Sequence, residues 1–154
     1  MDELDQKTLR FLMKKGRGTW AELGKLLHLT APAAAERARK LESDGTITGY
    51  TAIVDPQKLG FPLTAFVAVT IGDQGKRAKF LRLAERHPQI LECHHVAGED
   101  DYLLKIRCRG TADLDHFLSK TLKDGDLGVL RTRTTIVLAT AKETATLPTH
   151  PSDD

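Results

Sequence analysis

Apolar residues at helical spacing divide the first 45 residues into three short helices. Two of the helices are marked by apolar stripes: Leu4, Leu9, Leu12 and Met13, then Trp20, Leu23, Leu26 and Leu27. Thr19 and Glu22 stand three residues apart, which predicts a capping box at the start of the second helix. After the turn "HLT", Thr30 can cap a third helix that Gly45 ends. Two helices joined by so short a turn indicate a helix-turn-helix.

From residue 46 the pattern changes to β-branched and alternating residues. "TITGYTAIVD" predicts a strand, and "PQKLGFP" predicts a linker. The elements expected after it are a strand from Leu63 to Ile71, a helix over 75–87, strands in "ILECHHVA" and "DYLLKIRCR", a helix capped by Thr111, and a strand in "GVLRTRTTIVLAT". The order β-α-β-β-α-β is the ferredoxin-like arrangement, in which both helices cover one face of a four-stranded sheet.

These elements predict an α+β fold with two domains. A winged-helix-like helix-turn-helix domain is expected over 1–45, a β-strand linker over 46–62, a ferredoxin-like domain over 63–140 and a frayed tail over 141–154. Both faces of the sheet should be apolar, because Leu130, Ile136 and Leu138 alternate with Val129 and Val137. Since one layer of helices covers only one face, the other face predicts pairing with a second copy of the chain.

The third helix has the pattern of a DNA recognition helix. Ala34, Ala38 and Leu41 fall on one narrow stripe that should be buried. The exposed side begins with small residues, which let the backbone and the helix dipole approach DNA, and continues with cations that reach phosphates. The candidate DNA-binding residues are Thr30, Pro32, Ala33, Arg37, Arg39 and Lys40. The alternatives are that Glu36 and Lys40 form an ordinary surface pair and that Arg37 is a structural ion-pair partner.

Composition and charge limit the predicted partners and location of the protein. The net charge of the 154 residues is only +2, so the case for DNA rests on local geometry. The acidic start "MDELDQ" is unlike a signal peptide, and no apolar run is long enough for a membrane span. Cys93 and Cys108 fit buried, reduced thiols. We therefore expect a cytoplasmic, nucleoid-associated protein that has no membrane partner and no cofactor.

A second cluster of candidate residues is "HHVAGEDDYLL", residues 94–104. Three acidic residues follow Gly98 there, which suits either a hairpin turn or a small site for a ligand ammonium. Cys93, His94 and His95 are adjacent on an expected strand, so their side chains alternate between its faces and cannot converge on one metal ion. The chain has no Ser–His–Asp set, Walker loop or HExxH motif, so we expect no metal site and no enzyme activity.

Together these segments resemble the leucine-responsive and asparagine-sensing (Lrp/AsnC) family of transcriptional regulators. The resemblance runs from "LDQKTLRFLMKKGRGTWAELGKLLHLT" through "ERARKLESDGTITGYTAIVDPQKLG" and "AGEDDYLLKI" to "VLRTRTTIVL". It implies a domain that binds double-stranded DNA, a β-linker and an effector domain that dimerises through its sheet and assembles into octamers. It also implies a small effector, usually an amino acid. By that resemblance the effector-binding residues are Gly98, Asp101, Tyr102, Thr132 and Thr134.

The chain departs from the family at the recognition helix. Thr30 stands where the family usually has serine, and the stretch "APAA" that follows is poor in groups that read bases, which points to specificity through DNA shape. His94 and His95 near the expected pocket could add a pH response. The expected function is an effector-responsive transcriptional regulator. The alternatives are an enzyme of the same architecture, similar to sirohaem decarboxylases, and a nucleoid-organising protein with little effector response.

Overall fold

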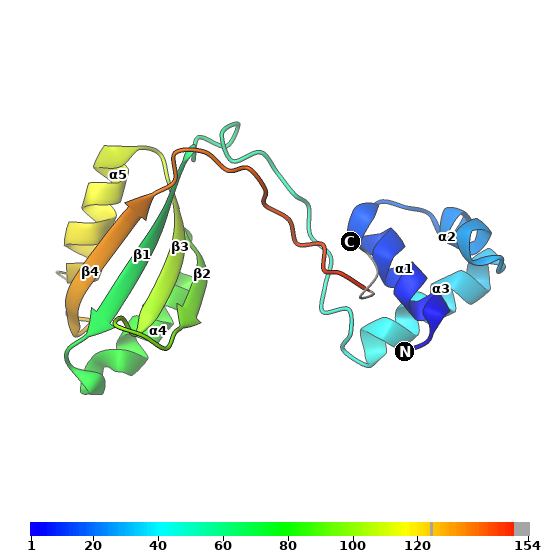
Figure 1. Ribbon diagram of the computed structural model, residues 1–154, viewed down its shortest axis with the longest axis horizontal. Helices are drawn as coiled ribbons and strands as arrows, with labels where there is room; N and C mark the ends of the chain where they lie inside the picture. The colour runs from blue at the N-terminus through cyan, green and yellow to red at the C-terminus, as the bar shows by residue number, and fades with distance from the viewer. Residues whose placement is uncertain (124, 150–154) are drawn as a thin grey trace. The chain divides into compact units, whose positions relative to one another are not determined.

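The computed structural model describes residues 1–123 and 125–149, which form two compact domains (Figure 1). The helical domain comprises residues 1–54 together with the segment from Lys142 onward, and the α/β domain comprises 55–141. Among the described residues, no helix has the length and apolar character that a membrane crossing requires. The expected domain boundaries at 45 and 62 lie on either side of the change of domain after Val54.

The helical domain contains α1 (Glu3–Lys14), α2 (Trp20–Leu27) and α3 (Ala31–Ser43). The predicted capping box of α2 is confirmed, because Glu22 N donates to Thr19 Oγ1 over 3.2 Å and Thr19 N donates to Glu22 Oε2 over 2.8 Å. The buried core is small: Leu23, Leu27 and Ala34 form its centre. Trp20 is not part of this centre and is 39% exposed.

The turn between α2 and α3 depends on a close backbone approach at Gly24. His28 takes a left-handed conformation with φ 56°, and Leu29 N donates to Gly24 O over 2.8 Å. A Cβ atom on Gly24 would lie only 2.7 Å from the carbonyl oxygen of Leu29. The short helix–helix turn that the sequence predicts therefore requires glycine at this position.

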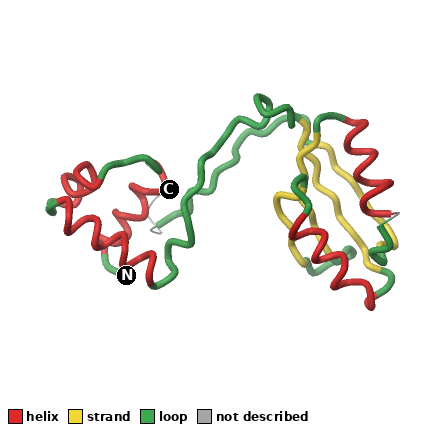
Figure 2. Tube along the Cα trace, turned by 180° about the vertical axis from the view of Figure 1, so that it is seen from behind, coloured by secondary structure: helices red, strands yellow, loops and turns green. Residues whose placement is uncertain are grey.

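The α/β domain has the predicted ferredoxin-like topology. Its elements are β1 (Leu63–Ile71), η1 (Gln74–Lys76), α4 (Arg77–Arg86), β2 (Ile90–His95), β3 (Tyr102–Cys108), α5 (Thr111–His116), the π-helical turn η2 (Phe117–Lys123) and β4 (Val129–Ile136). The four strands are antiparallel in the order β2-β3-β1-β4. Figure 2 shows the helices as one layer against the sheet.

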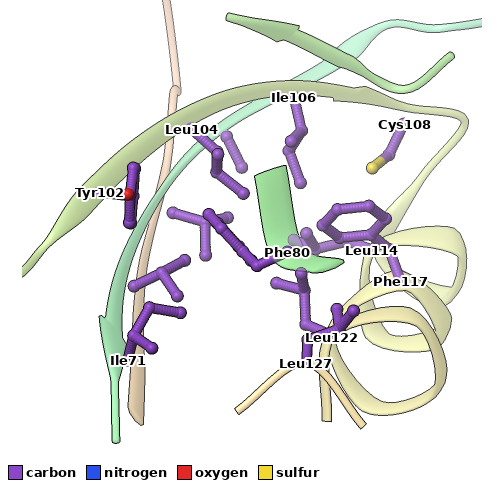
Figure 3. Packing of buried hydrophobic residues seen from close by; sticks show 13 residues of the cluster. Ile71, Phe80, Tyr102, Leu104, Ile106, Cys108, Leu114, Phe117, Leu122 and Leu127 are labelled. Atoms are coloured by element: carbon purple, nitrogen blue, oxygen red, sulfur yellow. The ribbon is translucent and has the colours of Figure 1, made fainter. Parts of the chain in front are cut away.

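The main core lies between this helical layer and one face of the sheet (Figure 3). Phe80 of α4 and Phe117 of η2 are fully buried against the strands. The sheet contributes alternate residues, namely Ala65, Val67, Val69 and Ile71 of β1 and Tyr102, Leu104, Ile106 and Cys108 of β3. The alternation predicted from the sequence is confirmed, and it leaves the opposite face of the sheet without a helical cover.

Two local predictions differ from the structure. Residues 46–62 form no strand, and no wing follows α3 in the helical domain, because strand assignment requires a neighbour and no described segment pairs with this stretch. Tyr50, Ile53 and Val54 are exposed there. Thr111 does not cap its helix; it is the first residue of α5, and Gly110 takes the cap position without a side-chain hydrogen bond.

Candidate DNA-binding and ligand-binding surfaces

Helix α3 buries the stripe predicted from the sequence and exposes its cations. Ala34, Ala38 and Leu41 are buried, as expected, and Ala35 is buried with them. Among the candidate DNA-binding residues, Pro32, Arg39 and Lys40 are exposed, Ala33 and Arg37 are half-buried, and Thr30 is the exposed N-cap. Its hydroxyl accepts a hydrogen bond from Ala33 N at 3.3 Å. Pro32 has no backbone N–H, and Ala34 N donates to Thr30 O over 3.0 Å.

Arg37 is engaged inside the domain. Its Nη1 donates to Asp2 Oδ2 over 2.8 Å and to Asp5 Oδ1 over 2.6 Å, and the Asp5 side chain is only 7% exposed. The hydrogen bond from Arg37 lowers the pKa of Asp2, and its bond to Asp2 raises the pKa of Arg37. This geometry favours the structural alternative for Arg37, which ties α3 to α1.

Arg39 and Lys40 differ from Arg37 in their surroundings. Arg39 Nη1 lies 3.0 Å from Glu36 Oε2, and the two side chains are 66% and 73% exposed. The expected surface pair of Glu36 is therefore made with Arg39 and not with Lys40. Since exposed pairs of this kind are weak, a DNA phosphate can replace the carboxylate.

The loop that carries Gly98 and Asp101 is fixed to the end of β1. Asp101 N donates to Val69 O over 2.9 Å, and Ile71 N donates to Asp101 Oδ2 over 2.7 Å. Gly98 has a φ of 153° and no atom within 4 Å of a hypothetical Cβ. One oxygen of Asp101 thus holds the loop, and the residue is half-buried.

Asp100 is the most buried acid of this loop, and sequence reasoning did not single it out. Its carboxylate accepts hydrogen bonds from Thr70 Oγ1 at 2.9 Å and from Arg133 Nη2 at 2.7 Å. Arg131 Nη2 lies 3.4 Å from the same carboxylate. The signal in the sequence was the spacing of Arg131 and Arg133, which puts both arginines on one face of the last strand.

The remaining effector candidates lie on the face that the helices cover. Tyr102 and Thr132 both pair with Val69, and Thr134 pairs with Val67, so their side chains share that face. Tyr102 is only 2% exposed, and its hydroxyl accepts a hydrogen bond from Arg77 Nε. Thr132 and Thr134 are half-buried on the edge strand β4. The structure groups these three residues on the sheet, and it places Gly98 and Asp101 in the loop that precedes β3.

The open face of the sheet is less apolar than the sequence suggested. Phe66, Ala68 and Leu103 form its centre, and Leu138 lies beyond β4 with 98% of its surface exposed. Charged residues surround that centre, and several are paired within the chain: Lys105 with Glu92 at 3.0 Å, and Arg133 with Asp100 at 2.7 Å.

The histidine and cysteine cluster has the alternation predicted for a strand. Cys93 pairs with Leu104 on the helix-covered face, whereas His94 pairs with Leu103 on the open face. Within residues 1–123 and 125–149, no group of three His, Cys, Asp or Glu side chains is arranged to hold a metal ion. The two cysteines are not bridged, and burial raises the pKa of the Cys108 thiol to about 11.

Two family models match this chain. Residues 1–42 match the AsnC-type helix-turn-helix domain, and residues 64–147 match the Lrp/AsnC ligand-binding domain. The regulator FL11 of Pyrococcus horikoshii is 36% identical over 148 residues, which are 96% of each chain. The regulator LrpA of Mycobacterium tuberculosis is 34% identical over 140 residues, which are 91% of each chain.

Solved structures show the same relationship. A transcriptional regulator of Neisseria meningitidis, solved as a complex with L-methionine, superposes with a TM-score of 0.91 and 31% identity over 96% of both chains. AsnC of E. coli superposes with a TM-score of 0.87 and 26% identity over 96% of this chain and 99% of its own. The matched domains and relatives are those of transcriptional regulators and not of enzymes, and the chain belongs to the Lrp/AsnC family of transcriptional regulators.

Proposed function

We propose that this regulator binds DNA through the exposed surface of α3 and that an amino acid modulates this binding. The observation that carries the DNA part is the arrangement of α3, where small residues at the N-terminus precede two exposed cations. The helix dipole favours phosphate at the N-terminus, while Arg39 and Lys40 reach further phosphates. Because Pro32 and Ala33 offer no hydrogen-bond donors to bases, sequence preference comes from DNA shape and bending.

Salt dependence tests the DNA surface. Arg39→Ala and Lys40→Ala should each weaken binding to all duplex sequences alike and lower the slope of log K against log salt by about one, because each removes a phosphate contact. The measurement is fluorescence anisotropy with a labelled duplex at several salt concentrations. Arg86→Ala, which removes an exposed cation from α4, is the matched control and should leave the slope unchanged. An unchanged slope in the folded Arg39→Ala/Lys40→Ala variant would disprove the assignment.

The effector part of the proposal centres on the loop of Gly98 and Asp101. The structure of the Neisseria relative is that of its complex with L-methionine. Residues 64–147 of this chain match the Lrp/AsnC ligand-binding domain. Oδ1 of Asp101 can accept from an α-ammonium while Oδ2 keeps its bond to Ile71 N. Gly98 leaves open space beside the loop. Thr132 and Thr134 can donate to the ligand carboxylate where a second copy of the chain completes the pocket.

Asp101→Asn separates these two roles of the carboxylate. The amide oxygen can still accept from Ile71 N, but the charge that attracts an ammonium is gone. After a thermal-shift screen of the twenty amino acids identifies the effector, calorimetric titration should show about tenfold to hundredfold weaker binding to Asp101→Asn. Glu99→Gln, in the same loop and 78% exposed, is the charge-matched control and should bind almost normally. Equal affinities of wild type and Asp101→Asn would mean that Asp101 only shapes the loop.

Homodimerisation through the open face of the sheet completes the proposal, with octamers as the further assembly. Pairing the charges within the chain lowers the cost of burying them, so two copies can bring their Phe66 side chains together. We expect light scattering of the full chain to show a dimer or larger species, and Phe66→Glu to give a monomer. Leu81→Glu, on the outer side of α4, should preserve the dimer. A dimeric Phe66→Glu variant would move the interface elsewhere.

A further inference from the structure

Strand β2 is an open edge of the sheet. It is the outermost strand on the side away from β4, and among the described residues it pairs only with β3 (Figure 1). Val96 N donates to Asp101 O, so the alternation of an antiparallel pair turns the backbone N–H and C=O groups of Cys93 and His95 away from β3. Such groups are a template for pairing with a further strand.

An exposed groove runs beside this edge, between β2 and α4. Its volume is about 370 Å³, and its lining includes Leu81 and Glu85 of α4 and Leu91 and Cys93 of β2. Leu81 is 39% exposed and Leu91 is 53% exposed, so both leucines leave apolar surface in water. An apolar groove next to an unpaired strand edge is typical of a surface that a partner strand covers.

The charges on this side of α4 are self-complementary. Leu81, Arg82 and Glu85 share one side of the helix, and both charged residues are exposed. Neither Arg82 nor Glu85 forms an ion pair with another residue that the structure describes. When two copies of α4 pack antiparallel around a two-fold axis between Leu83 and Ala84, Arg82 of each copy lies opposite Glu85 of the other. This reciprocity is what an interface between identical patches requires.

We propose that the groove and the open edge of β2 form an interface with a second copy of this chain. In it, β2 pairs antiparallel with β2 of the partner, and α4 packs against α4 of the partner. A two-fold axis at Cys93 places Glu92 opposite His94 of the partner, whereas an axis at His94 would bring two imidazoles together. The two grooves then close over each other's leucines. This interface lies at the edge of the sheet and leaves the open face free for the dimer proposed above.

The edge contact joins dimers, and in that respect it rests on the face-to-face dimer of the proposed function. It involves one strand and one side of one helix, so a single edge contact between two chains is small and weak. A face-to-face dimer carries two such edges. A closed ring of dimers uses both edges of every dimer, so each contact strengthens the others, and an octamer is such a ring.

Light scattering of the full chain tests the edge contact. Wild type should form species larger than a dimer, and Leu81→Glu, which puts carboxylates into the closed groove, should reduce these species to dimers. Arg82→Glu should do the same, because it places like charges opposite each other, and the added change Glu85→Arg should restore the larger species. Leu147→Glu, at a leucine of the helical domain that is 71% exposed, is the matched control and should keep them.

Cys93 gives a second readout, because the proposed axis puts the two copies of its side chain opposite each other. A short bis-maleimide should join two copies through Cys93, and either Cys93→Ser or Leu81→Glu should abolish this product. Cys108 is fully buried and should not react in the folded protein.

The outcomes separate the edge contact from the face-to-face dimer. A wild type that remains a dimer, with monomeric Phe66→Glu, would overturn the edge contact and keep the face-to-face dimer. Larger species that persist in Leu81→Glu and in Arg82→Glu, without a cross-link at Cys93, would overturn it as well. A dimeric Phe66→Glu variant that Leu81→Glu converts to a monomer would support the edge contact and contradict the face-to-face dimer.

Discussion

Gly24→Ala should strongly destabilise the helical domain and with it weaken DNA binding. The new methyl group would lie 2.7 Å from the carbonyl oxygen of Leu29 and 3.2 Å from the carbonyl carbon of Thr30, and both are backbone atoms that cannot rotate away. Forcing the α2–α3 turn apart should cost about 3 kcal/mol. A domain of this size has only a few kcal/mol of stability, at roughly 0.1 kcal/mol per residue, so a loss of this magnitude removes most of it.

Gly16→Ala is the matched control, because nothing lies within 4 Å of a Cβ atom at Gly16. Circular dichroism should show an unchanged melting curve for Gly16→Ala, and for Gly24→Ala a helical signal that is lost at a much lower temperature than in the wild type. The strands of the α/β domain should keep their signal in both variants, since Gly24 lies in the helical domain. A Gly24→Ala protein that melts like the wild type would show that the α2–α3 turn can open without loss of the fold.

The parts of the fold that the sequence predicted are those encoded by neighbouring residues. Thr19 and Glu22 mark the start of α2 through contacts three positions apart, and the alternation of β1 and β3 follows from burial of one face. The strand expected in "TITGYTAIVD" is not formed, for the opposite reason. A strand is defined by its partner, and the β-branched composition of that stretch shows its preference without supplying a partner among the described residues.

In the candidate site, too, the sequence could not predict contacts with distant segments. The sequence placed three acids after Gly98, but it could not assign their roles, because these depend on atoms of other strands. Asp100 accepts hydrogen bonds from Thr70 and Arg133, while Asp101 accepts one from the backbone N–H of Ile71. The contact between Arg10 and Thr149 could not be predicted either, since "LPTHPSDD" has little to bury and Thr149 contributes a hydroxyl group.

Arg37→Met should destabilise the helical domain, whereas Arg39→Met should weaken DNA binding without destabilising the domain. Met keeps the apolar stem of Arg37 but removes the guanidinium that donates to Asp2 and Asp5. The Asp5 carboxylate, which is 7% exposed, then keeps only its bond from Asp2 N. Loss of a charge-assisted hydrogen bond to this buried group should cost about 2 kcal/mol. Arg39 has no such buried partner, and its pair with Glu36 is exposed on both sides.

The pH dependence of Arg37→Met distinguishes the ion pair from a general loss of packing. The hydrogen bond from Arg37 lowers the pKa of Asp2 below its ordinary value of 3.8, so the pair stabilises the fold fully above that value. The stabilisation is lost as the pH falls through the lower pKa of the folded state. The melting temperature of the wild type should therefore be well above that of Arg37→Met at neutral pH. The two melting temperatures should approach each other as the pH is lowered. A constant gap from pH 7 to pH 3 would indicate lost packing. If Arg37→Met is as stable as the wild type at neutral pH but binds DNA as weakly as Arg39→Met, Arg37 is a DNA-binding residue and not a structural one.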